Sequence, residues 1–189
     1  GGTHHSAAPP GNTGDGLRLG EAAGGRVVED FASPGAWAPV SRVPRPDGGH
    51  AHFPHLVERA KPGVIAVTAE GRRFVNEAGS YHDVMRGLLV AVPPRQGTGR
   101  EVAAWLVCDH RFQRRYGLGF AKPFPFPLGP VLRSGYLKRG ATPEELAREC
   151  GIEPAGLAAT LAAWNRHARE GRDPEFDRGG TPYERVQGD

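Results

Sequence analysis

The sequence predicts an α+β fold, in which a small mixed or antiparallel sheet is combined with about three helices. Residues 63–68 and 102–109 are short apolar runs with the length and composition of buried strands. Residues 142–150 and 154–171 begin with a capping residue or a proline and carry apolar side chains at helical spacing. Because 28 glycines and 18 prolines stand among the 189 residues, we expect long loops between these elements.

The first predicted element is a turn at residues 12–16, followed by a short helix that ends at residues 24–25. Either Thr13 or Asp15 can cap this helix, and the two glycines of the turn let the backbone approach a ligand closely. On spacing alone, an ordinary capped helix explains the same pattern.

Residues 27–31 predict a strand, and residues 33–55 contain five prolines, which indicates a linker with a turn at 46–49. Three histidines of this linker lie close together in the sequence, at positions 50, 52 and 55. No cysteine or carboxylate completes a ligand set, so we expect exposed loop histidines and no metal site.

Most of the candidate chemistry follows the strand at 63–68. Residues 72–75 are expected to pair with that strand as a β-hairpin around a polar turn. Since neighbouring strand residues point to opposite sides, only one of Arg72 and Arg73 can face inward. Five of the next eight residues are candidates for the chemistry, namely Asn76, Glu77, Tyr81, His82 and Asp83.

The second half of the chain predicts helices with clear ends and one irregular apolar stretch. Helices are expected at residues 82–90, from Asp109 to Gly117, from the Thr142–Glu145 capping box to Gly151, and from Pro154 to Gly171. Residues 136–140 predict a short strand, and residues 172–189 predict a loop. Phe120, Phe124 and Phe126 either pack over a core edge or form the wall of an apolar pocket.

Composition and charge argue against several classes of function. The net charge is +3 and the charges are mixed in sign, so we expect no nucleic-acid partner. Two cysteines without a Cys-x-x-Cys motif predict neither a disulfide framework nor a zinc site. No apolar run reaches transmembrane length and no signal peptide is recognisable, so we expect a cytoplasmic protein.

Three segments together resemble one superfamily of flavoproteins. The residues Gly71-Arg72-Arg73-Phe74-Val75-Asn76-Glu77, with Tyr81, are similar to the glycine-arginine-phenylalanine-asparagine-glutamate segment of the fumarate reductase and 3-ketosteroid Δ1-dehydrogenase superfamily of FAD-dependent oxidoreductases. Asn12-Thr13-Gly14-Asp15-Gly16 is similar to that family's turn before a helix. Trp164-Asn165 and residues 171–179 are similar to a segment near its end. The three segments follow the family's order over nearly the whole chain.

The resemblance implies FAD as the cofactor of the full-length parent, with seven residues near it: Asn12, Thr13, Gly14, Asp15, Gly16, Asn76 and Glu77. It also implies that Tyr81 is the catalytic base, which removes a proton beside a carbonyl while a hydride leaves to the flavin. Because a phenol is protonated at neutral pH, this role needs a neighbouring donor or positive charge, and His82 and Arg86 both stand close enough in the sequence to supply it. From the residues alone, a half-buried Tyr81 bonded to backbone, and an Asn76-Glu77 pair that fixes the hairpin, explain the same pattern.

One motif of the resembled family is absent from the sequence. The Gly-x-Gly-x-x-Gly turn that binds a dinucleotide pyrophosphate does not occur. We therefore expect the middle of a longer enzyme, without the core of the FAD-binding domain and inactive in isolation because the cofactor carries the redox chemistry. The expected parts are a remnant of the FAD-binding domain at 1–31, a linker at 32–55, a substrate-binding capping domain at 56–180, and a segment returning toward the FAD domain at 181–189.

The implied substrate is an apolar, carbonyl-bearing small molecule such as a steroid, or a dicarboxylate. The implied reaction removes hydrogen from a C–C bond beside the carbonyl, or reduces the reverse C=C bond. The competing hypothesis is a stand-alone domain that binds a ligand or a protein, without flavin or catalysis.

Overall fold

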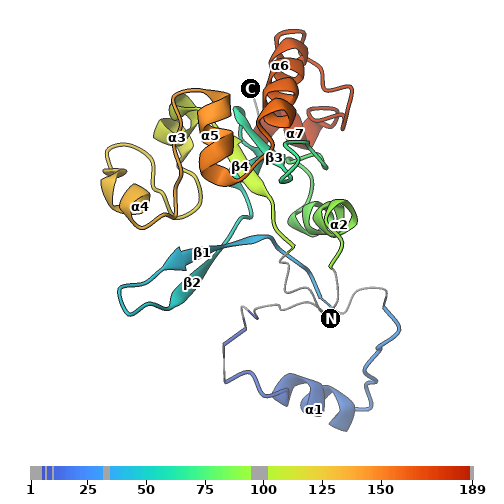
Figure 1. Cartoon of the computed structure of the whole chain (residues 1–189). Helices are drawn as coiled ribbons and strands as arrows, with labels where there is room; N and C mark the ends of the chain where they lie inside the picture. Colours follow the sequence, from blue (N-terminus) through green and yellow to red (C-terminus); the bar gives the residue numbers. More distant parts are fainter. Residues whose placement is uncertain (1–5, 7, 10, 32–34, 95–101, 188–189) are drawn as a thin grey trace. The chain divides into compact units, whose positions relative to one another are not determined.

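The computed structural model describes residues 6, 8, 9, 11–31, 35–94 and 102–187 (Figure 1). The chain forms two compact units, residues 1–36 and residues 37–189. The predicted α+β class is confirmed, with two separate two-stranded antiparallel sheets. The expectation of about three helices is wrong, because the described residues form seven α-helices and one 3₁₀-helix.

Unit 1 contains one helix, α1 (Asp15–Ala22), which follows the predicted turn. Its N-cap is Gly14 at φ 86°, and neither Thr13 nor Asp15 caps it through a side chain. The predicted strand at 27–31 is wrong, since these residues have no regular structure and no pairing partner among the described residues. An extended segment needs a neighbouring strand to satisfy its backbone groups, and none lies beside this one.

Unit 2 begins with a β-hairpin that the sequence analysis did not predict. Strands β1 (Val40–Pro44) and β2 (His50–Pro54) pair in antiparallel register, with Val40 opposite Pro54. The predicted turn between them is confirmed, since the amide of Arg45 donates to the carbonyl of Gly49 over 2.9 Å. The prediction of a loop or linker is wrong for residues 40–44 and 50–54, because Pro44 and Pro54 stand at the ends of the strands, where a two-stranded ribbon tolerates the missing N–H.

The central sheet pairs β3 (Val64–Val67) with β4 (Trp105–Cys108) in antiparallel register, and all four residues of β3 are buried. Both strands occur where the sequence predicts them, but the predicted hairpin of residues 63–75 is wrong. Residues 72–75 make only one isolated bridge, between Arg73 and Val67. The chain turns away after this bridge, because Val75 packs against Gly87 of the following helix and Arg73 binds carboxylates elsewhere.

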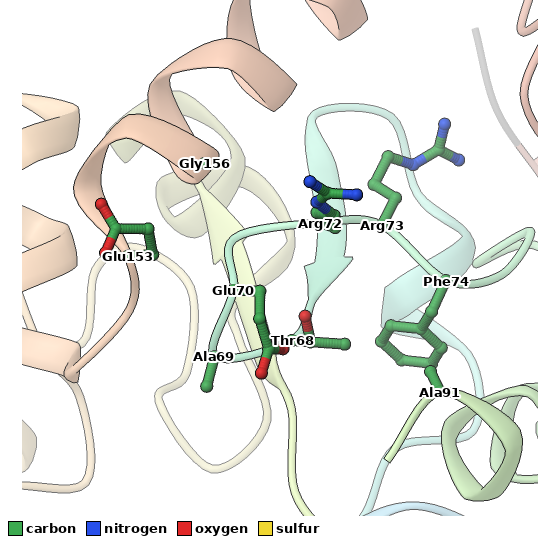
Figure 2. A pocket seen from close by; sticks show the side chains of 9 residues that line it. All are labelled: Thr68, Ala69, Glu70, Arg72, Arg73, Phe74, Ala91, Glu153 and Gly156. Atoms are coloured by element: carbon green, nitrogen blue, oxygen red, sulfur yellow. The ribbon is translucent and has the colours of Figure 1, made fainter.

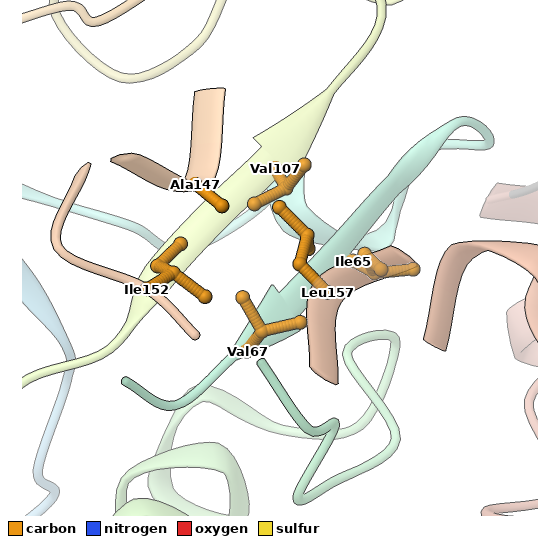
Figure 3. Packing of buried hydrophobic residues seen from close by; sticks show 6 residues of the cluster. All are labelled: Ile65, Val67, Val107, Ala147, Ile152 and Leu157. Carbon is orange, nitrogen blue, oxygen red and sulfur yellow. The ribbon is translucent and has the colours of Figure 1, made fainter. Parts of the chain in front are cut away.

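Helices α5 (Pro143–Cys150) and α6 (Pro154–Arg169) pack on the central sheet and form the core with it (Figure 3). The core residues are Ile65, Val67, Val107, Ala147, Ile152 and Leu157. The capping signals of α5 are confirmed: the Thr142 hydroxyl accepts from the amide of Glu145 over 3.2 Å, and Gly151 ends the helix at φ 68°. A Cβ atom at Gly156 would collide with the carbonyl oxygen of Glu70, so α6 touches the turn after β3 backbone to backbone.

The remaining helices surround this core: the 3₁₀-helix η1 (Glu58–Ala60), α2 (Tyr81–Ala91), α3 (His110–Tyr116), α4 (Gly129–Arg133) and α7 (Pro182–Gln187). Helices α2 and α3 are predicted elements, and the Asp109 carboxylate caps α3 by accepting from the amide of Phe112 over 2.7 Å. Helices α4 and α7 lie where the sequence predicts loops. The short strand predicted at 136–140 is wrong, since these residues form a bend and coil.

Candidate functional site

The segment from residue 71 to residue 83 has two parts, a mostly buried half at residues 73–79 and a mostly exposed half at residues 80–83. Arg73 belongs to the buried half and is 6% exposed, while Arg72 faces solvent, as strand alternation predicts. The Arg73 guanidinium binds two carboxylates in bidentate fashion. It donates to both oxygens of Glu77 over 2.9 and 2.7 Å, and to both oxygens of Asp173 over 2.9 Å each.

Two further arginines complete what we call the arginine–carboxylate cluster, made of Arg59, Arg73, Glu77, Asp173 and Arg178. Arg178 donates to Glu77 Oε2 over 3.2 Å, to the carbonyl of Val64 over 2.7 Å and to that of Lys61 over 2.7 Å. Arg59 donates to the backbone carbonyls of Glu77 and Gly79. No buried side-chain polar atom among the described residues lacks a hydrogen-bond partner.

Aromatic rings and backbone carbonyls compensate for the burial of these charges. The Arg73 guanidinium lies 4.3 Å from the ring centre of Trp164 and 5.0 Å from that of Phe176. Burial alone would raise the pKa of Asp173, but its hydrogen bonds to Arg73 and the positive charge of Arg73 outweigh this and hold the pKa below its usual range. Burial lowers the pKa of Arg178, since its guanidinium is removed from water.

Asn76 and Glu77, two predicted cofactor residues, lie inside this buried half. Glu77 is 0% exposed, and besides the arginines its Oε1 accepts from the amide of Ala66 in β3 over 3.0 Å. Asn76 donates to Glu184 of α7 over 2.9 Å and accepts from the amide of Ala78 over 2.9 Å. Both side chains therefore hold residues 73–79 against the sheet and the C-terminal segment.

Tyr81 and His82, the two predicted catalytic residues, begin α2. Ser80 caps this helix by accepting from the amide of Asp83 over 3.1 Å. Tyr81 is 38% exposed, and its hydroxyl makes no hydrogen bond to another described residue. The His82 ring is held by the amide of Trp37, which donates to Nδ1 over 3.1 Å. Because Nδ1 accepts, the proton of the neutral ring is on Nε2.

The other predicted cofactor residues, Asn12, Thr13, Gly14, Asp15 and Gly16, belong to unit 1. Apart from the half-exposed Gly14, all of them face solvent. Cβ atoms placed on the two glycines of this turn would meet nothing within 4 Å, so the backbone there is open to a ligand. The first turn of α1 also has no side-chain cap.

A pocket of about 620 Å³ opens next to the buried half (Figure 2). Its lining comes from the turn after β3, residues 68–74, and from Ala91, Glu153 and Gly156. Tyr81 and His82 do not line it. Its polar side chains include Glu70, Glu153 and Arg72, and no group of three or more His, Cys, Asp or Glu residues suited to a metal occurs in the described chain. Of the three linker histidines, His50 and His52 are exposed as predicted. The prediction of an exposed loop histidine is wrong for His55, which is 7% exposed because its ring packs against the unit and its Nδ1 contacts the Glu58 carboxylate.

Sequence reasoning did not find three members of the cluster: Arg59, Asp173 and Arg178. Residues 173–178 are part of the third resembling segment, yet in the sequence they indicate only a loop. Asp173 and Arg73 are 100 residues apart, and no local pattern pairs them. The sequence gives one hint of this pairing. Arg73 and Asp173 carry opposite charges, and each lies in a segment that resembles the same flavoprotein superfamily.

The whole chain matches the model of a known family, and its relatives are longer. The FAD binding domain family model covers residues 1–187. The chain is 42% identical over its full length to 4-oxocyclohex-2-ene-1-carboxylate 5-dehydrogenase of Sinomonas cyclohexanicum, covering 31% of that protein. It is 34% identical over 94% of its length to 3-oxosteroid 1-dehydrogenase of Mycobacterium tuberculosis, again covering 31% of that protein.

A solved structure shows the same relationship. The chain superposes with a TM-score of 0.69 and 31% identity on a crystal structure of 3-ketosteroid Δ1-dehydrogenase from Sterolibacterium denitrificans in complex with 1,4-androstadiene-3,17-dione. The match covers 97% of this chain and 32% of that protein. The chain therefore spans about a third of the length of the relatives it matches.

Proposed function

This chain belongs to the FAD binding domain family, and from this premise we propose that it is the central part of an FAD-dependent dehydrogenase. The proposed reaction removes hydrogen from a C–C bond beside a carbonyl group, or reduces the reverse C=C bond. Two relatives named as dehydrogenases of ring ketones, each at least 34% identical, support this choice of reaction. Because the chain spans about a third of these relatives, the activity is assigned to the longer polypeptide.

The observation that carries the proposal is the placement of Tyr81. Tyr81 lies at the start of α2 and is 38% exposed, and its hydroxyl makes no hydrogen bond to another described residue, so we assign this hydroxyl to contact with the substrate. Immediately before it, Arg59 binds the carbonyls of Glu77 and Gly79, and the Ser80 cap fixes the first turn. An exposed hydroxyl on such a rigid support is the arrangement that proton transfer at a fixed position requires.

In the proposed mechanism, Tyr81 removes the proton from the carbon next to the carbonyl group. His82 keeps its proton on Nε2, since Trp37 occupies Nδ1, and we assign His82 the role of the neighbouring donor that assists Tyr81. FAD, when bound, supplies the acceptor for the hydride that leaves the adjacent carbon. The double bond forms between these two carbons.

The turn at 12–16 fits a role in holding FAD in the longer polypeptide. Its glycines leave the backbone open, and the first amides of α1 are free of side-chain caps, which is the donor set that an anionic group requires. The half-buried Asn76 and the buried Glu77 fit direct contact less well, because their side chains already bind this chain's own groups. We therefore assign these two residues to positioning the Tyr81 segment.

For the substrate we propose a cyclic ketone in preference to a dicarboxylate. Three relatives that match at 31% identity or more are named for ring ketones or were solved with one. An apolar ring with one carbonyl needs mainly hydrophobic contact and a few placed polar groups.

The decisive experiment restores the sequence that flanks this chain in its gene. The proposal requires an upstream Gly-x-Gly-x-x-Gly segment, flavin absorbance in the purified longer protein, and reduction of an artificial electron acceptor with cyclic ketones. In that protein Tyr81→Phe is expected to lower kcat by about 10²–10⁴-fold. Tyr183→Phe, at an exposed tyrosine of α7, is the matched control and keeps its rate. A longer protein without flavin or the glycine motif would favour a stand-alone binding domain instead.

A further inference from the structure

The loop between α3 and α4 exposes three aromatic rings. We call residues 117–128 the phenylalanine loop. Its residues Phe120, Phe124 and Phe126 are 47%, 60% and 54% exposed. None of them lines the pocket in Figure 2. Large apolar side chains gathered in this way on a surface mark an interaction site.

The stretch of sequence that contains this loop, between Asp109 and Glu144, carries charge of one sign only. Residues 110–143 hold seven of the chain's 24 Lys and Arg and none of its 21 Asp and Glu. The net charge of +3 is therefore the sum of +7 in this region and −4 in the rest of the chain. All seven cations are exposed: Arg111, Arg114, Arg115, Lys122, Arg133, Lys138 and Arg139.

Rings and cations are held together on a fixed support. The Arg114 guanidinium lies 3.9 Å from the ring centre of Phe124, and Lys122 Nζ lies 4.8 Å from that of Phe126. The amide of Phe120 donates to the Tyr136 hydroxyl over 2.8 Å, which anchors one end of the loop. The amide of Phe124 donates to the carbonyl of Arg114 over 3.0 Å, which anchors the loop to α3.

We propose that the phenylalanine loop docks on an anionic phospholipid surface. In this arrangement the rings enter the boundary between headgroups and acyl chains, and the cations around them face lipid phosphates. Nucleic acid is less well matched, because bases stack on open ring faces, and Arg114 and Lys122 already lie over Phe124 and Phe126. No helix of the described residues is long and apolar enough to cross a bilayer. The inference does not depend on the proposed function.

The test is co-sedimentation of the 189-residue chain with vesicles of phosphatidylcholine alone and of phosphatidylcholine with one-quarter phosphatidylglycerol. Binding is expected only to the anionic vesicles and is expected to fall in high salt. Arg114→Gln with Lys122→Gln is expected to weaken binding roughly 25-fold, at about fivefold per cation. Phe124→Ser with Phe126→Ser is expected to weaken it by at least about tenfold, because two apolar anchors are lost.

Matched controls change the same residue types elsewhere. Arg166→Gln with Arg169→Gln on α6, and Tyr183→Ser with Val186→Ser on α7, are expected to keep vesicle binding within about twofold, with circular dichroism confirming the fold. A Phe126→Trp variant is expected to shift its emission to the blue on anionic vesicles only. Equal loss in the controls, no preference for anionic vesicles, or tighter binding to DNA with the Phe variants unaffected would overturn the proposal. So would loss of binding in the longer polypeptide, since flanking sequence would then cover the loop.

Discussion

Arg73, Glu77 and Tyr81 belong to one short segment, yet the first two and the third occupy different environments. Arg73 and Glu77 are buried and have every polar atom bonded, whereas the Tyr81 hydroxyl is exposed and bonds to no other described residue. The difference separates two kinds of motif residue. Residues of the first kind, Arg73 and Glu77, hold the segment in its conformation. The residue of the second kind, Tyr81, has a hydroxyl that is available to a substrate. Substitutions should therefore act on stability in the first half and on catalysis in the second.

The largest effect is expected for Arg73→Met. Removing this guanidinium leaves Glu77 and Asp173 buried with one cation fewer, so we expect unfolding in urea to show a loss of about 3–5 kcal/mol. Arg72→Met, at the exposed neighbour, is the matched control and should change stability by no more than about 0.5 kcal/mol. Equal effects of the two substitutions would show that burial of Arg73 does not decide its role.

The next effect is expected for Asp173→Asn, with a loss of about 1.5–3 kcal/mol at neutral pH because a charged hydrogen-bond acceptor is lost. The pKa of Asp173 is lower in the folded than in the unfolded chain. Its contribution is therefore present above the unfolded pKa, near pH 4, and is lost as pH falls through the folded pKa. The variant should show a shallower loss of stability between pH 5 and pH 2. Glu149→Gln, an exposed acid on α5, should leave that slope unchanged.

A smaller effect is expected for Ser80→Ala, which removes the cap of α2. The loss should be about 1 kcal/mol, and Ser80→Asn should restore most of it, since Asn caps equally well. Hydrogen exchange at the first amides of α2 measures this locally. If the exchange of those amides is the same in both variants, the cap does not fix the start of the helix.

The smallest effect on stability is expected for Tyr81→Phe, within about 0.5 kcal/mol, because the hydroxyl is exposed and makes no bond to a described residue. Thermal unfolding of the variant and the parent chain gives the comparison. A loss above about 1 kcal/mol would place the hydroxyl with the structural residues and would remove the distinction between the two halves.

Local signals in the sequence predicted local structure well. Thr142, Asp109 and Gly151 mark helix ends through interactions within a few residues, and each stands where the structure has a helix boundary. The central strands were found because both are short apolar runs. The prolines of β1 and β2 misled the prediction, since in sequence they indicate a linker while in the structure they stand at strand ends.

Long-range pairing could not be predicted from the residues alone. Residues 72–75 have strand-like composition, but the charge of Arg73 finds its partners near residue 173, and this pairing outweighs the tendency to form a hairpin. The candidate catalytic residues came from a resemblance, and their exposure or burial became known only with the fold. Sequence identified the segment of interest, and three-dimensional pairing separated its two roles.

The link between Arg73 and the region from Asp173 to Arg178 also sets an order of events during synthesis. Translation proceeds from the N-terminus, so β3 and the Glu77 carboxylate leave the ribosome long before their C-terminal counterions exist. Until residue 178 has emerged, the Glu77 carboxylate has only the hydrogen bonds from Arg73 and the amide of Ala66, and the carbonyl of Val64 lacks its bond from Arg178. A nascent chain stopped ahead of residue 173 should therefore remain sensitive to protease, and completion of the last segment should close the unit.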